Sequence, residues 1–455
     1  MRIKEAIDYV YASYLKAEPY LEYDAPDSKK RNPEWTRFIL LKRIGLPTVL
    51  VTGSKGKGSV SKMIAEIMGV HRKTGMMTSP HMQVFNERFQ VDGEMISDDE
   101  LAEIISDLKP EFDSVEAKLS KEQYISPMGI QAAIALEWFP KKGVEFQVLE
   151  CGKGVAYDDV GNIPHKYGVI NRIFLEHTRE LGATLSDIAT NKSMLITGSE
   201  KAVFTSAQAP EVIGILRKRA VEKGVNLYEY GQDFWCENVT FTKKGMQFDV
   251  KISENVLKNT PKNEDISSAS RDNLHIKDII IPLLGTHQAE NFALALAICV
   301  AELGENLKIE EMKQKIRRLN WPGRLEILQE EPLILLDACI NKESCKNVQE
   351  VLHNLKIGKI ASIIAIPKDK DFLGVTQCMT DVSGAIFLTK TGNPHYVFGQ
   401  EQVDILRQKG VSCEWSDSVE SAIELAKITK LPIAILGTTS LITDVKEIWQ
   451  KKEVK

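Results

Sequence analysis

Short apolar, β-branched runs alternate with segments of helical periodicity along most of the chain. Residues 48–52 predict a strand, and residues 59–68 predict a helix because their apolar positions recur at the spacing of one helix face. Further strands are predicted at residues 146–150, 168–171, 202–205, 334–337, 360–366 and 433–436. Strands separated by helices of this length form parallel sheets with helices on both faces, so the pattern predicts an α/β fold.

Two segments interrupt this alternation. Residues 256–275 are polar and lack periodicity, and they predict a flexible surface loop between two strands. The stretch Asn320–Arg324 contains Pro322 and Gly323, ends a helical pattern and precedes a new strand. At 455 residues the chain is long enough for two or three domains. We therefore predict a first domain over residues 1–320 and a smaller α/β domain over residues 321–455.

Composition excludes several classes of protein. Lys and Arg number 58 against 63 Asp and Glu, a net charge of −5, so no overall positive field exists to attract nucleic acid. The seven cysteines are scattered without zinc-type spacing, which indicates reduced, buried thiols. The N-terminus lacks a continuous apolar core, and no stretch reaches the ~18 apolar residues of a membrane span. These features predict a cytoplasmic protein with no membrane or nucleic-acid partner, and they leave its oligomeric state open.

The strongest chemical signal lies between the first predicted strand and its helix. The residues of this predicted phosphate-binding loop are Gly53, Ser54, Gly56, Lys57, Gly58 and Ser59. The glycines allow backbone N–H groups to turn inward around a polyphosphate, and the helix N-terminus adds a partial positive charge. Lys57 supplies a full positive charge, and Ser59 offers a hydroxyl to the Mg²⁺ that accompanies a nucleotide.

One residue separates Lys57 from Ser59, so the loop departs from the general Gly-x-x-x-x-Gly-Lys-Ser/Thr form. It resembles instead the loop of the Mur ligase superfamily, and most closely that of the folylpolyglutamate synthase and dihydrofolate synthase branch. Further segments resemble that branch in the same order: Thr78–His81, Phe85–Arg88, Leu149–Gly152, Glu176-His177, Lys192, Gly285–Asn291, Trp321–Arg324, Asp337, Lys368–Asp371 and Gly437–Ser440. The resemblance implies an N-terminal P-loop domain that binds ATP on a parallel sheet, and a smaller Rossmann-like C-terminal domain.

The resemblance also implies ATP-dependent amide-bond formation. A carboxylate attacks the γ-phosphate to give an acyl phosphate and ADP, and an amine then displaces phosphate. Such chemistry depends mainly on positioning and on cations near the phosphates. The catalytic residues implied are Lys57, His177, Lys192 and Arg324, of which Lys57 and Arg324 would be the cations on the phosphates and Lys192 can carry a carbamate.

The same resemblance implies where the cofactors bind. One or two Mg²⁺ ions would be held by Ser59, Ser79, Glu150 and His177. Asn291 would face adenine, and Asp337 would hold the ribose. Oxygen and imidazole ligands of this kind suit a Mg²⁺ ion that neutralises phosphate charge.

Three departures from the branch fall on the substrate side. An arginine of the family is absent from residues 152–162, residues 125–129 replace another family segment, and Ile340 stands where the family has a histidine. An aliphatic side chain can neither donate nor accept a hydrogen bond. The predicted function is therefore an ADP-forming ligase of a small-molecule carboxylate and an amino acid or amine, with altered second-substrate motifs. Two alternatives stay open: a Mur-like ligase of a peptidic or cell-envelope carboxylate, and a non-catalytic or amidotransferase-type subunit with a glutaminase partner.

Overall fold

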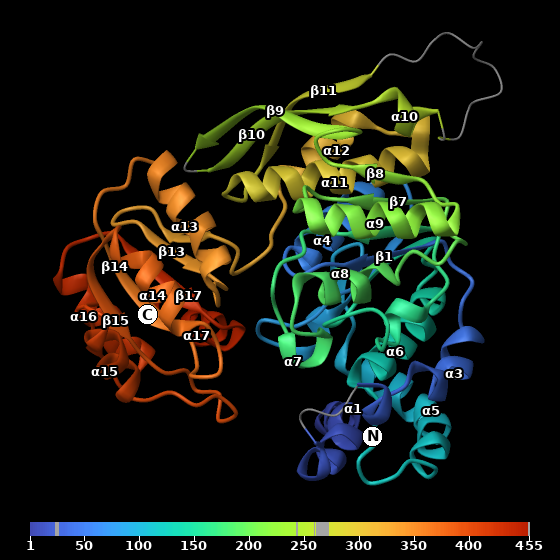
Figure 1. Cartoon of the computed structure of the whole chain (residues 1–455), viewed down its shortest axis with the longest axis horizontal. Helices are drawn as coiled ribbons and strands as arrows, with labels where there is room; N and C mark the ends of the chain where they lie inside the picture. Colours follow the sequence, from blue (N-terminus) through green and yellow to red (C-terminus); the bar gives the residue numbers. More distant parts are fainter. Residues whose placement is uncertain (23–26, 243, 259, 261–272, 454–455) are drawn as a thin grey trace. The chain divides into compact units, whose positions relative to one another are not determined.

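The computed structural model describes residues 1–22, 27–242, 244–258, 260 and 273–453. They form two compact units, coloured along the chain in Figure 1. The first unit comprises residues 1–237, 249–279 and 290–319, and the second comprises residues 238–248, 280–289 and 320–455.

The first unit is built on an eight-stranded sheet in the order β4-β3-β2-β5-β1-β6-β7-β8. Its strands are β1 (Thr48–Thr52), β2 (Thr74–Met77), β3 (Phe89–Val91), β4 (Glu94–Met95), β5 (Phe146–Glu150), β6 (Tyr167–Ile170), β7 (Ala202–Thr205) and β8 (Leu227–Glu229). The six strands from β2 to β8 in this order are parallel, and β3 and β4 continue the sheet in antiparallel pairing. The sheet confirms the predicted α/β fold.

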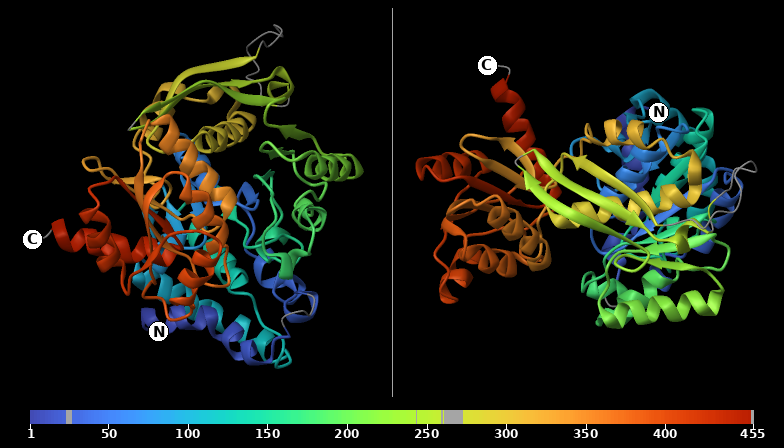
Figure 2. Two further views of the ribbon diagram at one scale, coloured as in Figure 1. Left: turned by 60° about the vertical axis from the view of Figure 1, so that its left-hand side comes forward. Right: turned by 90° about the horizontal axis from the view of Figure 1, so that it is seen from above.

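Helices cover both faces of this sheet (Figures 1 and 2). The helices of the first unit are α1 (Ile3–Ala17), α2 (Asp27–Lys30), α3 (Arg37–Leu41), α4 (Lys57–Met68), α5 (Asp98–Glu116), α6 (Pro127–Lys141), α7 (Thr178–Leu181), α8 (Leu185–Ser193), α9 (Pro210–Lys223), α10 (Glu254–Leu257), α11 (Thr286–Leu303, whose residues 286–289 fall in the second unit) and α12 (Ile309–Ile316). All five residues of the central strand β1 are buried, as its unbroken apolar run requires. Leu50 packs in the core formed with α1, α5 and α6.

The second unit contains a six-stranded sheet in the order β12-β13-β17-β14-β15-β16. The strands are β12 (Glu326–Gln329), β13 (Ile334–Asp337), β14 (Ile360–Ala365), β15 (Ser383–Leu388), β16 (Glu414–Trp415) and β17 (Ile433–Gly437). The helices are α13 (Lys342–Asn354), α14 (Phe372–Thr380), α15 (Glu401–Gln408), α16 (Val419–Ile428) and α17 (Thr439–Glu453). Only the β12–β13 pairing among these six strands is antiparallel.

A separate three-stranded sheet has the order β11-β10-β9. Its strands are β9 (Phe234–Thr242), β10 (Gly245–Ile252) and β11 (Leu274–Ile281), and their residues are divided between the two units. The loop predicted at residues 256–275 falls mostly outside the described residues. At its described ends the prediction is wrong, because residues 256–257 belong to α10 and residues 274–275 to β11.

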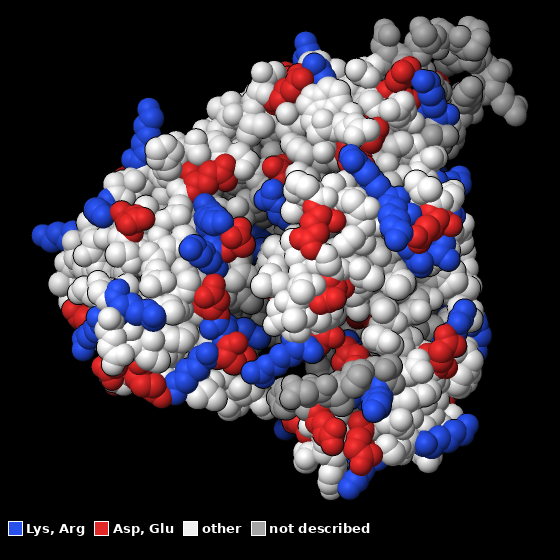
Figure 3. Space-filling model, in the orientation of Figure 1, with Lys and Arg blue, Asp and Glu red and all other residues white. Residues whose placement is uncertain are grey.

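The surface carries charge of both signs. On the face shown in Figure 3, Lys and Arg side chains are interspersed with Asp and Glu over the described parts of each unit. This agrees with the net charge of −5. None of the helices in the described ranges has the length and apolar character needed to cross a membrane.

Candidate functional site

Four neighbouring parallel strands of the first unit, β2, β5, β1 and β6, end at the same edge of the sheet. Val51 of β1 pairs with Glu150 of β5, and Thr52 pairs with Ile170 of β6. The segments that leave this edge therefore start side by side, and they carry Ser79, Glu150, the predicted phosphate-binding loop and His177. The carboxyl edge of a parallel sheet is where α/β proteins bind ligands.

The loop between β1 and α4 is closely packed and needs its glycines. Gly53 has φ 142° and Gly56 has φ 81°, conformations that L side chains rarely adopt. A Cβ atom at Gly56 would lie 2.4 Å from Nδ2 of Asn171. Gly56 is the N-cap of α4, so Lys57, Gly58 and Ser59 form the first turn of the helix, whose backbone N–H groups lack partners within the helix. This loop and helix N-terminus provide the expected geometry of a phosphate cradle.

Ser54 ties the loop to the segment that follows β6. Its backbone N–H donates to the carbonyl of Arg172 at 2.9 Å, and its hydroxyl donates to the carbonyl of Phe174 at 3.1 Å. The same hydroxyl accepts the N–H of Phe174 at 3.1 Å. Ser54 therefore fixes the loop by hydrogen bonds to neighbouring backbone.

Lys192 is a buried cation beside the same loop. It lies on α8 with a fully buried side chain, and its Nζ donates to the carbonyl oxygens of Gly53 at 3.0 Å and Lys153 at 2.8 Å. It also forms an ion pair with Oε1 of Glu176 at 3.2 Å. Three acceptors match the three N–H bonds of an ammonium group. Burial lowers the pKa of Lys192 to about 8, although the charge of Glu176 opposes this shift.

Lys57 approaches the Gly53 carbonyl as well, with Nζ at 3.2 Å from the oxygen. Two lysine side chains thus converge on one carbonyl at the start of the loop. Positive charge is concentrated where a polyphosphate would bind, and the neighbouring carboxylate of Glu176 partly balances it.

Glu150 and Ser79 meet at the adjoining strand ends. Glu150 ends β5 with 3 % of its surface exposed, and its Oε2 accepts the backbone N–H of Ser79 at 3.0 Å. Ser59 is also buried, on the first turn of α4. These three residues bring a carboxylate and two hydroxyl-bearing side chains to the same edge of the sheet.

His177 lies just before α7 in a left-handed conformation, with φ 46°. Its Nε2 is 3.8 Å from Oε2 of Glu176. Burial lowers the pKa of His177 to about 4, and the nearby Glu176 charge opposes that shift. The imidazole is therefore neutral near pH 7, as a metal-binding histidine must be.

The oxygen and nitrogen donors at this edge suit Mg²⁺ better than a metal ion whose ligands all come from protein side chains. Across the described ranges, no group of three or more His, Cys, Asp or Glu side chains is placed to hold a metal ion. Mg²⁺ commonly takes one or two carboxylates and completes its octahedron with water and substrate phosphates. The buried Glu150 carboxylate and the Ser59 hydroxyl are compatible with such a site.

Asn291 lies against the loop and is hydrogen-bonded to Asn171, a residue that the sequence analysis did not single out. Oδ1 of Asn291 accepts a hydrogen bond from Nδ2 of Asn171 at 2.9 Å, and both side chains border Gly56. Asn171 directly follows β6, and a polar residue at the end of a buried strand is the signal that could have indicated it. The sequence analysis named Glu176 only as part of a motif. Its ion pair with Lys192 could not be predicted, because it depends on where α8 packs.

The second unit holds Arg324 and Asp337 close to one turn. Oδ2 of Asp337, at the end of β13, accepts the backbone N–H of Leu325 at 2.9 Å. Nη1 of Arg324 donates to the carbonyl of Gly323 at 3.0 Å. The Gly323 carbonyl also accepts the N–H of Ala338, which fixes the turn beside the strand end. Ile340 follows in the same loop, before α13.

Two of the three altered segments come together inside the first unit. Gly129 lies so close to Asp159 that a Cβ atom there would be 2.7 Å from its carboxyl group. The hydroxyl of Thr36, from the N-terminal region, donates to the same carboxyl. Burial raises the pKa of Asp159 to about 6, while the Thr36 hydrogen bond and the positive charge of Arg31 oppose that shift.

Arg31 is a second residue that sequence reasoning missed. Its side chain is 12 % exposed and pairs with Asp27 at 2.9 Å. Arg31 also lowers the pKa of the fully buried Asp158, which burial raises, and Asp158 accepts the N–H of Gly152 at 3.0 Å. A buried arginine from the N-terminal region thus lies beside the segment that lacks the arginine of the family.

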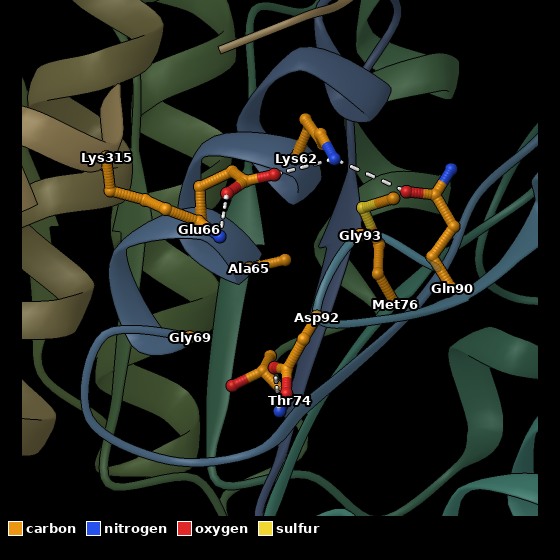
Figure 4. Close-up of a pocket in the computed structure, with 10 residues that line it drawn as sticks. All are labelled: Lys62, Ala65, Glu66, Gly69, Thr74, Met76, Gln90, Asp92, Gly93 and Lys315. Atoms are coloured by element: carbon orange, nitrogen blue, oxygen red, sulfur yellow. Dashed lines mark hydrogen bonds and ion pairs between the residues drawn. The ribbon is translucent and has the colours of Figure 1, made fainter. Parts of the chain in front are cut away.

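A further polar cluster on α4 surrounds a cavity that is too small to hold a nucleotide. Glu66 pairs with Lys62 at 2.7 Å and with Lys315 at 3.3 Å, as Figure 4 shows. The cavity between these residues and Asp92 has a volume of about 10 Å³, which is room for about one water molecule. This cluster fixes α4 to neighbouring elements of the first unit.

Comparison with known proteins identifies the family. The family model described as the Mur ligase middle domain matches residues 51–299, more than half of the chain. This chain belongs to the Mur ligase family. The match includes the β1–α4 loop, Glu150, His177, Lys192 and Asn291.

Curated relatives are similar in sequence to this chain over nearly all of its length. The dihydrofolate synthase/folylpolyglutamate synthase of Bacillus subtilis is 27% identical over 90% of this chain and 93% of its own length. The folylpolyglutamate synthase of Lacticaseibacillus casei is 23% identical over 96% and 98%. A probable bifunctional folylpolyglutamate synthase/dihydropteroate synthase of Haloferax volcanii is 24% identical, and this chain spans only 47% of it.

Solved structures show the same fold. Folylpolyglutamate synthase of Mycobacterium tuberculosis, solved with ADP and AMPPCP, superposes with a TM-score of 0.82 at 21% identity over 97% of this chain and 99% of that chain. The apo form of the L. casei enzyme gives a TM-score of 0.79 at 21% identity over 99% and 100%. The predicted Mur ligase family and the general kind of enzyme, a ligase, are confirmed, and the similar proteins found are folylpolyglutamate synthases, the branch that the sequence resembles.

Proposed function

We propose that this protein is an ATP-dependent, ADP-forming ligase that joins a small-molecule carboxylate to an amino acid or another amine through an acyl phosphate. The observation that carries the proposal is the convergence of Lys57 and Lys192 on the Gly53 carbonyl, beside the buried Glu150. In this assignment residues 1–320 form the ATP-binding domain and residues 321–455 the C-terminal domain.

The chain's own groups account for phosphate binding. The N–H groups at the start of α4 and the Lys57 ammonium would surround the β- and γ-phosphates, where transferred charge builds up. Arg324 would supply a second cation to the phosphates, Asn291 would face the adenine and Asp337 would hold the ribose. The family resemblance supports these three roles.

Mg²⁺, when bound, would neutralise charge on the phosphate oxygens. Glu150, Ser59 and Ser79 are the oxygen donors of this chain at the proposed site, and the neutral His177 imidazole is the nitrogen donor. Glu150 is oriented by the Ser79 N–H, so one carboxylate oxygen is held by the backbone.

Lys192 is the proposed site of a carbamate. Only a neutral amine adds CO₂, and a pKa of about 8 leaves roughly one lysine in ten neutral at pH 7, far more than for an ordinary lysine. The carbamate would place an anion near Glu176 and two carbonyl oxygens, so its formation requires these groups to rearrange or a metal ion to offset the charge.

We propose that the carboxylate substrate of this protein differs from the folates that appear in the names of its relatives. The segments at 125–129 and 152–162 have changed, and Ile340 cannot make the hydrogen bonds of a histidine. The largely buried Arg31 guanidinium and the buried Asp158 carboxyl group add a positive and an acidic group to the altered region. A site built to hydrogen-bond one substrate discriminates strongly when such polar groups are replaced. A pterin-like, peptidic or cell-envelope carboxylate is the proposed class.

A substrate screen tests the proposal. Purified protein with ATP and Mg²⁺ is incubated with folates, nucleotide-linked peptides or free acids, each paired with common amino acids, and ADP and product masses are measured. We expect ADP release only when both acid and amine are present. Lys57→Ala should abolish turnover, and Lys218→Ala, at an exposed lysine of α9, should retain it. Efficient glutamylation of tetrahydrofolate would overturn the proposed substrate class, and turnover only with a glutaminase partner would favour the amidotransferase-type alternative.

A further inference from the structure

Asn171 contacts both the predicted phosphate-binding loop and Asn291, and the roles proposed above do not include it. It directly follows β6, and its backbone N–H donates to the carbonyl of Thr52, at the end of β1, at 2.8 Å. Its own carbonyl accepts a hydrogen bond from Nε2 of Gln208 at 3.1 Å. Because both main-chain groups are bonded, the backbone that carries the Asn171 side chain is fixed beside the loop.

The side-chain amide of Asn171 is held in one of its two orientations. Its Oδ1 accepts the backbone N–H of Arg172 at 2.8 Å, and a backbone N–H can only donate. The oxygen therefore faces Arg172, and the Nδ2 group forms the other end of the amide. With 3 % of its surface exposed, Asn171 has little access to water as an alternative partner.

The orientation of Asn171 in turn sets the orientation of Asn291 on α11. Nδ2 of Asn171 donates to Oδ1 of Asn291 at 2.9 Å, and a group that carries hydrogens needs an acceptor opposite it. Asn291, which is 5 % exposed, therefore turns its oxygen toward Asn171. The other end of the Asn291 amide is Nδ2, a donor. One backbone N–H thus determines, through two amide groups, which end of Asn291 is turned away from Asn171.

Both amide groups lie directly against Gly56. A Cβ atom on Gly56 would be 2.4 Å from Nδ2 of Asn171, 3.0 Å from Oδ1 of Asn291 and 3.2 Å from Nδ2 of Asn291. Gly56 is the N-cap of α4, where the proposed function places the phosphates of ATP. The orientation of Asn291 is therefore set next to the proposed nucleotide site.

We propose that Asn171 is a positioning residue that holds the Asn291 amide with its donor, Nδ2, toward the adenine of ATP. This inference rests on the proposed function, in which Asn291 faces the base. Adenine accepts hydrogen bonds at its ring nitrogens N1, N3 and N7, so an Nδ2 donor can pair with one of them. With the amide turned over, the Oδ1 acceptor would instead oppose the lone pair of that ring nitrogen.

Binding of ATP and of its deaza analogues tests the proposal. In 1-deaza-, 3-deaza- and 7-deaza-ATP, a C–H group replaces one ring nitrogen and so removes one acceptor. Each nucleotide is titrated with Mg²⁺ into the full-length wild-type protein by isothermal titration calorimetry. One analogue should bind about tenfold more weakly than ATP, because the buried Nδ2 donor of Asn291 loses its acceptor.

Asn171→Asp should abolish this discrimination. A carboxylate only accepts, so Asn291 would turn Nδ2 toward residue 171 and Oδ1 toward the base. ATP should then bind no more tightly than the analogue that the wild type rejects. The added negative charge repels the phosphates of ATP and of the analogue alike. The ratio of the two affinities therefore reports the orientation of the amide and not this repulsion.

Two further variants separate positioning from folding and from charge. Asn171→Leu keeps the approximate size of the side chain and removes its hydrogen bonds, so the affinity ratio should fall toward one without an added charge. Asn32→Asp adds the same charge at an amide whose oxygen accepts the N–H of Glu34 at 3.0 Å, and it should keep the wild-type ratio. Circular dichroism shows whether each variant is folded.

The outcomes distinguish this proposal from the proposed function. A wild-type ratio in the folded Asn171→Asp or Asn171→Leu variant would overturn the role of Asn171 and leave ATP binding intact. Equal binding of ATP and all three analogues by the wild type would do the same. A wild type that binds no ATP would overturn the proposed function, and the role of Asn171 with it.

Discussion

The ammonium group of Lys192 donates to the carbonyl oxygen of Gly53 at 3.0 Å, although the two residues are 139 positions apart in the sequence. Helix α8, from the middle of the chain, thereby supports the start of the predicted phosphate-binding loop. The same ammonium pairs with Glu176, next to His177, so one buried charge links the loop to the segment that carries the proposed nitrogen ligand.

Replacing Lys192 tests its proposed carbamate. Lys192→Ala removes three hydrogen-bond donations and should lower turnover by at least a hundredfold, because the loop loses its support and the site loses the modified group. If a carbamate acts there, short-chain carboxylates such as acetate should partly restore turnover. Steady-state ADP release with and without acetate is the measurement. Full activity of the alanine variant without additives would show that Lys192 has neither role.

The lowered pKa of Lys192 predicts a dependence of stability on pH. The folded-state pKa of Lys192 is about 8 and the ordinary pKa of a lysine is 10.5, so between these values the unfolded chain binds more protons than the folded one. Stability contributed by this group therefore rises as pH increases above 8. Between pH 7 and 9.5 the unfolding free energy of the wild type should increase by about 2 kcal/mol relative to Lys192→Met. Urea unfolding of both proteins at the two pH values measures it, and parallel pH profiles would contradict it.

Gly56→Ala should weaken nucleotide binding at least tenfold without unfolding the protein. The left-handed φ of 81° strains any L side chain, and the new Cβ would displace Asn171 and Asn291. The matched control is Gly143→Ala, whose φ of 70° is similar but whose Cβ would meet open space. Titration with a fluorescent ATP analogue should show at least tenfold weaker binding for Gly56→Ala alone. Equal affinities in the two variants would place the nucleotide elsewhere.

Arg31→Met should destabilise the first unit. The change removes the positive charge that compensates the buried Asp158 and leaves Asp27 without its arginine, a loss of about 3 kcal/mol for a buried ion pair. The control Arg217→Met breaks an ion pair with Glu229 whose arginine is 55% exposed, and should cost less than about 1 kcal/mol. Chemical denaturation compares the two, and equal effects would show that Arg31 is not an electrostatic partner of the altered segments.

Local sequence was sufficient for the parts of the site that lie on one strand–loop–helix unit. This unit consists of adjacent segments: the strand 48–52, the glycines after it and the helix that begins at Lys57. Their arrangement follows from the spacing of apolar residues and from the backbone conformations that glycine allows. Arg31 and Asn171 act through contacts with residues over a hundred positions away, and no local pattern encodes such contacts. The burial of Lys192 was likewise not predictable, because a lysine on a helix is ordinarily solvated.

Several of the strands missed by sequence analysis give only a weak local signal. β3, β4, β8 and β16 are two or three residues long, too short for an alternating pattern to appear. β9 is longer but exposes polar residues along one face, and β10 is mostly buried even though polar and apolar residues alternate along it. Their pairing in the three-stranded sheet depends on neighbours that the local sequence does not specify.

In the proposed reaction, ATP activates a carboxylate as an acyl phosphate. The most direct test uses the acid identified by the substrate screen, with both carboxylate oxygens replaced by oxygen-18, together with ATP, Mg²⁺ and the amine. We expect ADP as the nucleotide product and one heavy oxygen in each phosphate released, measured by phosphorus NMR or mass spectrometry. Release of AMP and pyrophosphate, or of phosphate without label, would contradict it.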